Sequence, residues 1–465
     1  MEQRAIFDAD LIRRYDTPGP RYTSYPTAAQ FHEGITAEDY RQWAEDSNTP
    51  EFGKKLSLYF HIPFCDTVCF FCGCNKIATK DRGRNAPYLQ HLYQDMQQQA
   101  QLFDSSRVVE QLHWGGGTPT FLGLDQMAEL MDTTRQQFSL RDDDLGEYSI
   151  EIDPRTTNPE GIAFLRQQGF NRISMGVQDF NPEVQKAVNR IQPQEQTLEI
   201  LDAARTYGYR STNIDLIYGL PFQTPDSFKH TLETIITASP DRLSIFNYAH
   251  MPHLFPPQRR INDEDLPSPE QKLDILEHTI EQLIQAGYVY IGMDHFAKPD
   301  DSLSIAQKNG TLHRNFQGYS THADCDLVGM GVSSISKVAH GYSQNVKKLD
   351  DYYQRINSGQ QALFRGVETT HDDRLRCEII MQLMCHSKLD FAPIENAFNI
   401  TFGEYFSTEL TRLSDMQKDG LLQIDASQIQ VSPQGRLLMR NICLIFDRYL
   451  KEHQQQPQTR FSRTI

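Results

Sequence analysis

The sequence lacks any uninterrupted apolar run of about eighteen residues, the length that a membrane-spanning helix needs. Its first residues, MEQRAIFDADLIRRYD, contain no apolar core of the kind found in secretory signals. Basic residues are not in excess, because 45 Lys and Arg face 61 Asp and Glu, for a formal net charge of −16. We therefore expect no membrane partner and no general binding to nucleic acid. Any anionic ligand must be bound by a few local Lys or Arg side chains.

Cysteine is scarce and unevenly placed. The chain has 8 cysteines in 465 residues, and four of them fall within YFHIPFCDTVCFFCGCNK, residues 59–76. This clustering differs from the spaced pairs of a disulfide framework, so we expect a reducing, cytoplasmic environment. Thiolates crowded on one loop repel one another unless a cation holds them, which indicates a metal or iron–sulfur site. The remaining four are expected to be buried as small apolar side chains: Cys325, Cys377, Cys385 and Cys443.

Apolar, strand-like runs alternate with amphipathic helical stretches through the centre of the chain. The strand-like runs are residues 56–62, 108–114, 147–153, 172–178, 211–220 and 242–249. Helical patterns between them include residues 87–103, 124–138 and 195–208. Such alternation, repeated about six times, predicts a parallel sheet with helices outside. The sheet closes into a full or partial barrel or stays open and doubly wound, and in each case ligands bind at the carboxyl ends of the strands.

Polar residues occur where several of these apolar runs end. Glu151, Gln178 and Asp215 each lie within or at the end of one run, and the glycine turn GGGTPT, residues 115–120, follows another. Each residue alone suits an ordinary hydrogen-bonding role in the core. Their shared position on successive strands favours one common pocket.

The regions outside this alternation predict further domains. Residues 1–48 are broken by Pro and Gly around DTPGPRYTSYPTA, residues 16–28, and form an arm that packs on the surface or covers a site. Residues 49–367 form the main domain, and residues 368–465 form a mainly helical domain. Within the latter, residues 421–435 have the pattern of a two-stranded wing, and a Gln-rich tail lies near residue 455.

The cysteine spacing separates two kinds of site. Structural zinc usually takes two close pairs of ligands separated by a dozen or more residues, whereas CxxxCxxCxC lies on one short loop. Cys65, Cys69 and Cys72 can occupy three corners of a cubane cluster and leave the fourth iron open. Cys74 can also reach such a cluster, and spacing alone does not exclude it. With Cys74 as a fourth ligand the cluster would serve electron transfer only.

CxxxCxxC after the first strand of a β/α repeat resembles the radical S-adenosylmethionine (SAM) superfamily, and GGGTPT resembles its glycine strip. The similarity continues over almost the whole chain and resembles the family of oxygen-independent coproporphyrinogen III oxidases, also called coproporphyrinogen dehydrogenases. It is carried by PGPRYTSYPTA, YFHIPFC, CGCNKI, QLHWGGGTPT, FNRISMGVQDFN, STNIDLIYGLP, FNYAH, LHRNFQGYST and RNICLIFDRYL. The resemblance implies a partial (β/α)6 TIM-like barrel of the radical SAM type, with an N-terminal arm and a mainly helical C-terminal domain.

The same resemblance implies a reaction and its cofactors. Family members convert coproporphyrinogen III to protoporphyrinogen IX by oxidative decarboxylation of two propionates to vinyl groups, a step of anaerobic haem biosynthesis. They use one [4Fe-4S] cluster and two SAM molecules, and a deoxyadenosyl radical from SAM removes a hydrogen from the propionate. Carbon dioxide then leaves, and one electron passes to an acceptor. A low-potential electron donor and an electron acceptor are therefore expected partners, and a monomer is the expected state.

Matching residues of the family assign the site in this chain. The implied cluster ligands are Cys65, Cys69 and Cys72, and Glu151 is the implied catalytic residue. Contacts of the cluster-bound SAM are implied for Tyr59, Phe71, Gly116, Glu151 and Ile335. Contacts of the second SAM are implied for Gly117, Thr118, Gln178, Arg190, Asp215 and Ala249. By chemistry, Asp215 suits a ribose hydroxyl and Arg190 suits a carboxylate.

A tetracarboxylate substrate needs local cations on so acidic a chain. The candidates are Arg21, Lys76, Lys80, Arg82 and Arg314. Gln317 and Tyr319, with a small-residue turn expected at residues 329–336, are further candidates for the substrate surface. His61 and His113 are expected to be packed and hydrogen-bonded, not metal ligands.

Three other functions fit parts of the pattern. A radical SAM enzyme with another substrate keeps the cluster loop and changes the pocket. A haem or cluster carrier would use CGC for binding, and a zinc-stabilised interaction protein would use the cysteines as structural ligands. Iron content, a SAM-dependent spectral change and the products formed from coproporphyrinogen distinguish these readings.

Overall fold

The computed structural model describes residues 5–49, 54–322 and 325–450, so the Gln-rich tail near residue 455 lies outside it. The chain divides into two compact units. Unit 1 comprises Met1–Ala29, Pro269–Ala323 and Thr369–Ile465, and unit 2 comprises Gln30–Ser268 and Asp324–Glu368. The predicted arm is therefore divided after residue 29, with its larger share in unit 1. In the described ranges every helix is too short or too polar to cross a bilayer.

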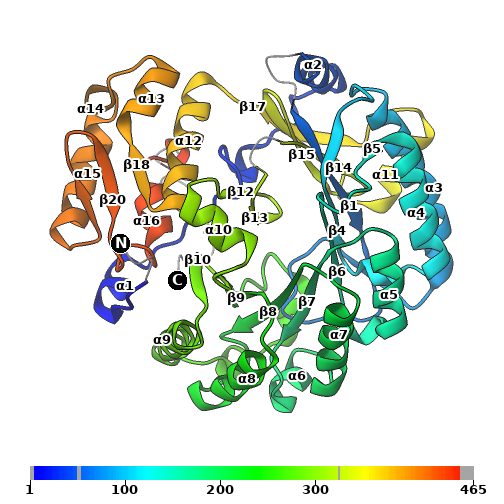
Figure 1. The fold of residues 1–465 in the computed structure, drawn as a ribbon, viewed down its shortest axis with the longest axis horizontal. Coiled ribbons are helices and arrows are strands. Elements are labelled where there is room, and N and C mark those ends of the chain that lie inside the picture. Colours follow the sequence, from blue (N-terminus) through cyan, green and yellow to red (C-terminus); the bar gives the residue numbers. More distant parts are fainter. Residues whose placement is uncertain (1–4, 50–53, 323–324, 451–465) are drawn as a thin grey trace. The chain divides into compact units, whose positions relative to one another are not determined.

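Unit 2 is built on a parallel sheet in which each strand follows its neighbour in the chain (Figure 1). The strands are β1 (Lys55–Ile62), β4 (Val108–Gly116), β6 (Glu147–Ile152), β7 (Arg172–Gln178), β8 (Ser211–Tyr218) and β9 (Arg242–Asn247). They lie in the order β9-β8-β7-β6-β4-β1, and every neighbouring pair is parallel. The six strand-like runs of the sequence are thereby confirmed, as is the partial (β/α)6 arrangement. All six carboxyl ends consequently meet at one edge of the sheet.

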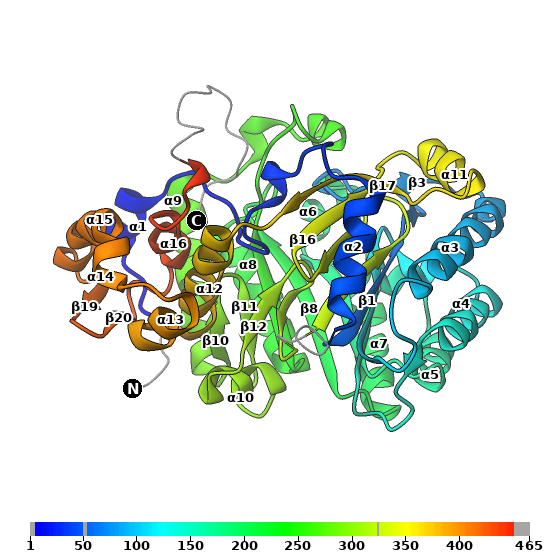
Figure 2. The same ribbon diagram turned by 90° about the horizontal axis from the view of Figure 1, so that it is seen from above.

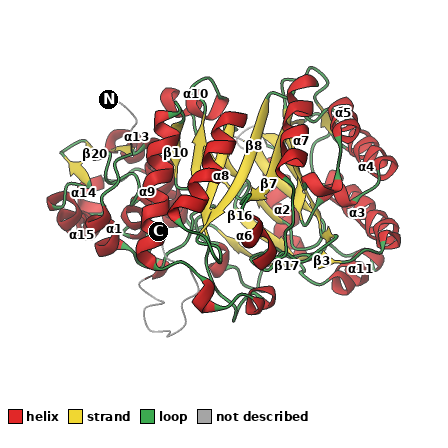
Figure 3. Ribbon diagram, turned by 90° about the horizontal axis from the view of Figure 1, so that it is seen from below, coloured by secondary structure: helices red, strands yellow, loops and turns green. Residues whose placement is uncertain are grey.

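Helices connect these strands and cover the outer face of the sheet, as Figures 1 and 3 show for α3, α4, α5 and α7. Their bounds are α3 (Asn85–Ala100), α4 (Leu124–Gln137), α5 (Pro159–Gln167), α6 (Pro182–Ala187), α7 (Gln194–Thr206) and α8 (Pro225–Ala238). The helix starts follow from capping chemistry. Asn158 accepts the Gly161 amide at the start of α5, and Thr224 forms a capping box with Ser227 on α8. On α4 the side chains at Met127, Leu130 and Met131 are buried, so one stripe faces the sheet.

The sheet continues beyond β1 with strands that the sequence did not predict. β14 (Cys325–Met330) pairs in parallel with β1, and three strands follow in antiparallel order: β15 (Ile335–Val338), β16 (Gly341–Asn345) and β17 (Leu363–Glu368). The small-residue turn expected at residues 329–336 is confirmed for residues 331–334, while its two ends belong to β14 and β15. Its small residues serve close strand approach, because a Cβ on Gly329 would lie 2.5 Å from the Ile335 carbonyl oxygen. α2 (Ala37–Ser47) lies across β15 and β16, with Trp43 against Gly341 (Figure 2).

Short elements complete unit 2. β2 (Phe64–Cys65) pairs with β3 (Ile77–Ala78), β5 (Ser139–Leu140) pairs with β4, and α11 (Leu349–Asn357) packs against α3. The first of these pairs matters most for function, because it frames the cysteine loop.

Unit 1 is mainly helical in its C-terminal part, as predicted. Its helices there are α12 (His371–His386), α13 (Phe391–Phe398), α14 (Phe402–Tyr405), α15 (Ser407–Lys418) and α16 (Met439–Leu444). The predicted two-stranded wing has three strands, since β18 (Lys388–Asp390) joins β19 (Leu422–Ile424) and β20 (Gln428–Val431). Tyr22 and Tyr25 are buried in the same apolar core, which explains how the Pro-rich N-terminal stretch is held.

The rest of unit 1 comes from earlier parts of the chain. These are α1 (Ala9–Tyr15), α9 (Pro269–Gln285), β10 (Val289–Gly292), β11 (His295–Ala297), α10 (Ser302–Asn309), β12 (His313–Asn315) and β13 (Gly318–Ser320). β12 and β13 form an antiparallel hairpin that carries RNFQGYS.

Candidate iron–sulfur and cofactor site

The cysteine loop leaves the sheet at the carboxyl end of β1. Pro63 ends that strand, and β2 and β3 then pair in parallel at the two ends of the loop. Backbone bonds tie these ends together, with Ile77 N 2.7 Å from Pro63 O and Thr79 N 2.9 Å from Cys65 O. The residues between Cys65 and Ile77 are thus closed into a compact loop at the edge where ligands are expected.

Cys65 is buried, and its sulfur accepts a hydrogen bond. Thr118 Oγ1 lies 3.4 Å from Cys65 Sγ, and the Thr118 amide donates to Phe64 O at 2.9 Å. Burial raises the pKa of the Cys65 thiol to about 11. A ligating cation would reverse this preference, because metals bind the thiolate.

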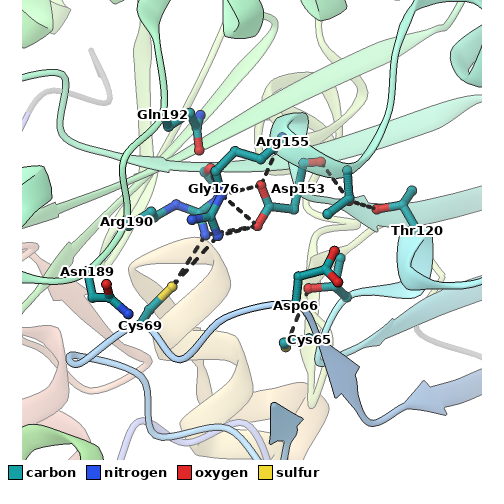
Figure 4. Close-up of polar contacts among 12 residues, drawn as sticks. Cys65, Asp66, Cys69, Thr120, Asp153, Arg155, Gly176, Asn189, Arg190 and Gln192 are labelled. Atoms are coloured by element: carbon teal, nitrogen blue, oxygen red, sulfur yellow. Dashed lines mark hydrogen bonds and ion pairs between the residues drawn. The ribbon is translucent and has the colours of Figure 1, made fainter. Parts of the chain in front are cut away.

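Cys69 lies beside two guanidinium groups. Arg190 Nη1 is 3.6 Å and Arg155 Nη2 is 4.0 Å from Cys69 Sγ, as Figure 4 shows. Asp153 holds both arginines, accepting from Arg155 Nη2 at 2.6 Å and from Arg190 Nη1 at 3.2 Å. Burial disfavours ionisation of Asp153, but the two arginines outweigh it and hold its pKa below the usual range. Two cations against one carboxylate leave positive charge directed at the Cys69 sulfur.

Cys72 and Cys74 form a hydrogen-bonded pair. The bond from Cys74 lowers the pKa of the Cys72 thiol to about 5 against the effect of burial, and the pKa of Cys74 rises in turn. Lys76 Nζ lies 3.1 Å from the Cys72 carbonyl oxygen and adds positive charge. Cys74 is the exposed member of the four. Its exclusion as a ligand stays a prediction.

The surroundings of the loop sulfurs suit an iron–sulfur cluster. A tetrahedral zinc site needs its ligands gathered around one centre, whereas a cubane takes each cysteine on a separate iron. Hydrogen bonds directed at cysteine sulfur from Thr118 and Arg190 are those expected around a cluster.

The glycine strip requires glycine because of the loop beside it. A Cβ on Gly117 would lie 2.8 Å from the backbone of Pro63 and Phe64, and one on Gly116 would lie 2.6 Å from the His61 ring. Gly116 also has φ +114, a conformation that other residues rarely adopt. Close packing of strip and loop therefore places the Gly116 and Thr118 backbone next to the cysteines.

Glu151 lies at the centre of the polar residues on this edge. Its Oε2 accepts the Gly116 amide at 3.2 Å, and its Oε1 is 3.3 Å from His113 Nε2. Burial opposes ionisation, yet His113 and the Gly116 amide together hold the pKa of Glu151 below its usual range. Its side chain is nevertheless 45% exposed, so a carboxylate is available to a ligand.

Tyr59 and Ile335 lie close to this group. Tyr59 stacks on His113 with ring centroids 5.8 Å apart, and its hydroxyl lies 3.1 Å from His61 Nδ1. Its partner across the sheet is Gly329, the residue that closely approaches Ile335. Both histidines are packed and hydrogen-bonded, as predicted: His61 Nε2 pairs with Asn75 O, and His113 Nδ1 pairs with Ser149.

A second group of polar side chains lies on β7 and β8. Asp215 is held by Asn213 Nδ2 at 2.7 Å and Ser174 Oγ at 3.3 Å, and burial raises its pKa to about 6. Gln178 ends β7 with φ +72, and its Oε1 has no hydrogen-bond partner within the described residues. A buried acceptor-rich surface with an unused amide oxygen suits a ligand that carries hydroxyl and amine donors.

Arg190 makes different contacts from those expected of a SAM-binding fork. Both terminal nitrogens contact protein groups, Nη1 bonding Asp153 and Cys69 and Nη2 bonding the Gly176 carbonyl. Nε alone has no partner in the described part of the chain. Arg190 thus lies at the cysteine loop, and a contact with SAM stays a prediction.

Two residues of this site were missed by the sequence reasoning. Gln258 is buried, and its Nε2 lies 3.0 Å from Phe71 O and 3.3 Å from Ala249 O, so it joins two predicted SAM contacts. The other is Arg155, which lies three residues beyond the end of β6. The rule that selected Glu151, polar residues at the carboxyl ends of strands, would also have selected Arg155. Gln258 lies in an irregular Pro-rich stretch that gives no periodic signal.

Comparisons with known proteins agree with this geometry. Residues 59–235 match the model of the radical SAM superfamily, and residues 369–438 match the HemN C-terminal domain. The chain is 56% identical over 459 residues to the oxygen-independent coproporphyrinogen III oxidase of Pseudomonas aeruginosa, covering 99% of both. It is 51% identical to that of Escherichia coli K12, covering 100% of this chain and 99% of the other. The solved structure of coproporphyrinogen III oxidase (HemN) from Escherichia coli, described as a radical SAM enzyme, superposes with a TM-score of 0.91 at 50% identity, covering 96% of this chain and 100% of that one.

Proposed function

The chain belongs to the family of oxygen-independent coproporphyrinogen III oxidases, and from this premise we propose the reaction and the roles of its residues. It converts coproporphyrinogen III to protoporphyrinogen IX by oxidative decarboxylation of two propionates to vinyl groups, in anaerobic haem biosynthesis. The observation that carries this proposal is the cysteine loop packed against the glycine strip, at the carboxyl edge of a parallel sheet.

Cys65, Cys69 and Cys72 hold the [4Fe-4S] cluster in this proposal. Thr118 donates a hydrogen bond to the first sulfur, and Arg190 and Arg155 direct positive charge at the second. When bound, the cluster and SAM supply the one-electron chemistry that begins hydrogen removal from a propionate. The protein groups around the sulfurs keep the thiolate form and lower the cost of the added negative charge.

Glu151 binds the positively charged end of the cluster-bound SAM. Its carboxylate is ionised, partly exposed and fixed on both oxygens by His113 and Gly116. Tyr59 and Ile335 contact the same SAM molecule, and the backbone of Phe71 contacts its adenine. A fixed anion suits the SAM amine, because its two hydrogen bonds keep it from rotating away.

A second SAM molecule is bound by the groups on β7 and β8. Asp215 accepts hydrogen bonds from the ribose, and Gln178 offers its unpaired Oε1. Gly117 and Thr118 supply backbone groups, and Gln258 holds the Ala249 carbonyl in place. Two SAM molecules for two decarboxylations is the stoichiometry that we propose.

Anaerobic reconstitution tests the proposed function. We expect about four irons per chain and a change in the cluster spectrum when SAM is added. The reduced enzyme should then release carbon dioxide from coproporphyrinogen III and form the divinyl product. Formation of deoxyadenosine without release of carbon dioxide would indicate a radical SAM enzyme with another substrate. A protein that binds no iron after reconstitution would favour the zinc-stabilised interaction protein.

A further inference from the structure

Arg314 is a buried arginine, and two of its three guanidinium nitrogens lack hydrogen-bond partners in the described part of the chain. It lies on β12 opposite Tyr319, is 4% exposed, and stacks on the Tyr319 ring at 4.7 Å from the centroid. Its Nε and Nη1 have no hydrogen-bond partner among the described residues, and neither has Nε2 of Gln317 in the same hairpin. A guanidinium stays charged in proteins, so leaving it buried and unpaired is costly. Such a group is expected where a ligand completes it.

The surroundings of Arg314 are positively charged. Asp294 is the carboxylate of this cluster and pairs with Arg21. Burial opposes ionisation of Asp294, but the charges of Arg21, His295, Arg440 and Arg314 keep its pKa below the usual range. Three guanidiniums thus act on the Asp294 carboxylate, which makes this region favourable for an added anion.

The neighbouring arginines, Arg440 and Arg21, are already bonded to other groups of the protein. Arg440 donates to the Gly19 and Pro20 carbonyls, and burial together with the charge of Arg21 lowers its pKa to about 10. Arg21 is engaged with Asp294. Arg314 is therefore the member of this cluster whose Nε and Nη1 are available to donate to a ligand.

The other candidate cations are less suited to an anion. Lys76 bonds the Cys72 carbonyl, and Arg82 bonds Asp66 and the Phe121 carbonyl. Lys80 is exposed to solvent, where an ammonium group contributes little. Burial without a partner distinguishes Arg314 from all of these.

We propose that Arg314, with the amide of Gln317 beside it, binds a propionate carboxylate of the substrate. This inference rests on the proposed function, since that function supplies a tetracarboxylate ligand. Nε and Nη1 lie on different edges of the planar guanidinium, so each can donate to one carboxylate oxygen, and the permanent positive charge favours an anion. In this proposal Arg21 and Arg440 add positive charge near the carboxylate without contacting it.

Binding of coproporphyrin III to the reconstituted holoenzyme tests the site, because this oxidised analogue keeps the propionates of the substrate. Arg314→Met should weaken its binding by roughly 10- to 100-fold, the effect of a lost charge-assisted pair. Arg314→Lys should lose less affinity, because lysine keeps the positive charge but lacks the planar guanidinium and its several donors. Arg374→Met is the matched control, because Arg374 is an exposed arginine of unit 1, and it should leave affinity unchanged.

Two further measurements separate binding from folding. The unaltered enzyme should bind the tetramethyl ester of coproporphyrin III more weakly than the acid, and Arg314→Met should show a smaller difference between the two. The Tm of ligand-free Arg314→Met should not fall, because the substitution removes an unpaired buried charge. Equal acid-to-ester ratios in both proteins, or a lower Tm with unchanged affinity, would overturn the inference. Failure of the unaltered enzyme to bind the acid at all would instead count against the proposed function.

Discussion

Two groups of buried cysteines in this chain differ in the direction of their hydrogen bonds. Cys65 and Cys69 in the loop and Cys385 and Cys443 in unit 1 are all buried. Burial raises the pKa of Cys65 to about 11 and that of Cys385 to about 12, and it also raises the pKa of Cys443 well above the usual value. Burial and acidity alone therefore do not separate a ligand from a core residue.

The partners of the sulfur atoms do separate them. Cys65 accepts from Thr118, and Cys69 faces Arg190 and Arg155. Cys443 instead donates to the Ile380 carbonyl at 3.9 Å inside an apolar core. A sulfur surrounded by donors is prepared for the thiolate form, and a sulfur that donates remains a thiol.

The largest expected effect tests this difference at the cysteines themselves. Replacing Cys65, Cys69 or Cys72 by Ser should abolish cluster binding, because each thiolate holds one iron. Iron and sulfide analysis after anaerobic reconstitution measures this directly. Cys443→Ala is the matched control: it should retain iron and lose about 1 kcal/mol of stability through the small cavity. Full iron content in a Cys69→Ser protein would refute the assignment.

The same comparison explains what the sequence could and could not predict. The strand–helix alternation and the cysteine loop have local signals, and the six strands of the parallel sheet, β1, β4, β6, β7, β8 and β9, lie where the apolar runs predicted them. β14 has no such signal, because its place depends on pairing with β1 far away in the chain. The third wing strand, β18, was missed for the same reason.

Side-chain contacts between residues far apart in the chain also cannot be predicted from a local sequence pattern. The sequence selected Cys69 by spacing and Arg190 as a SAM contact, but it did not place Arg190 or Arg155 beside Cys69. Asp153 brings the two arginines together only in three dimensions. Gln258 likewise acts through two carbonyls from distant segments. Residue type and spacing predict ligands well, whereas the groups that position them require the folded chain.

A second prediction extends the comparison to buried carboxylates. Asp215 and Asp95 both have a pKa raised by burial to about 6. We propose that Asp215 binds SAM, whereas Asp95 accepts from Gly331 N and Tyr352 OH inside the fold. Asp215→Asn should weaken SAM binding about 10-fold, as expected for one hydrogen bond to a charged group, and Asp95→Asn should leave it unchanged. Equilibrium binding of SAM to the reconstituted proteins measures both.

The raised pKa of Asp215 also gives a pH dependence with a definite sign. The folded protein holds this proton up to about pH 6, whereas an unfolded Asp loses it near pH 4. Stability contributed by the protonated form is therefore complete below about pH 4 and lost as pH rises through about 6. Asp215→Asn should raise the Tm at pH 8 and leave it nearly unchanged at pH 4. An equal rise at both values would assign the effect to packing.

A smaller effect is expected from the arginines at Cys69. Arg155→Gln removes one of two cations near the sulfur while Arg190 remains paired with Asp153. The cluster should stay bound, and its reduction potential should fall by roughly 50 mV, close to the value of a tenfold change for one electron. Redox titration followed by electron paramagnetic resonance measures the shift. Arg135→Gln, on α4, is the control and should not change the potential.

The smallest expected effect belongs to Cys74, which has features of both groups. It lies on the loop, but it is exposed. Its thiol donates to Cys72, so the direction of its hydrogen bond resembles that of Cys443 and not that of the cluster ligands. Cys74→Ser should leave iron content unchanged, because a serine hydroxyl can also donate to the Cys72 sulfur. Cys74→Ala removes that donor and should alter the reduction potential slightly without loss of iron. Loss of iron in both variants would make Cys74 a fourth ligand, and the cluster would then have no open iron for SAM.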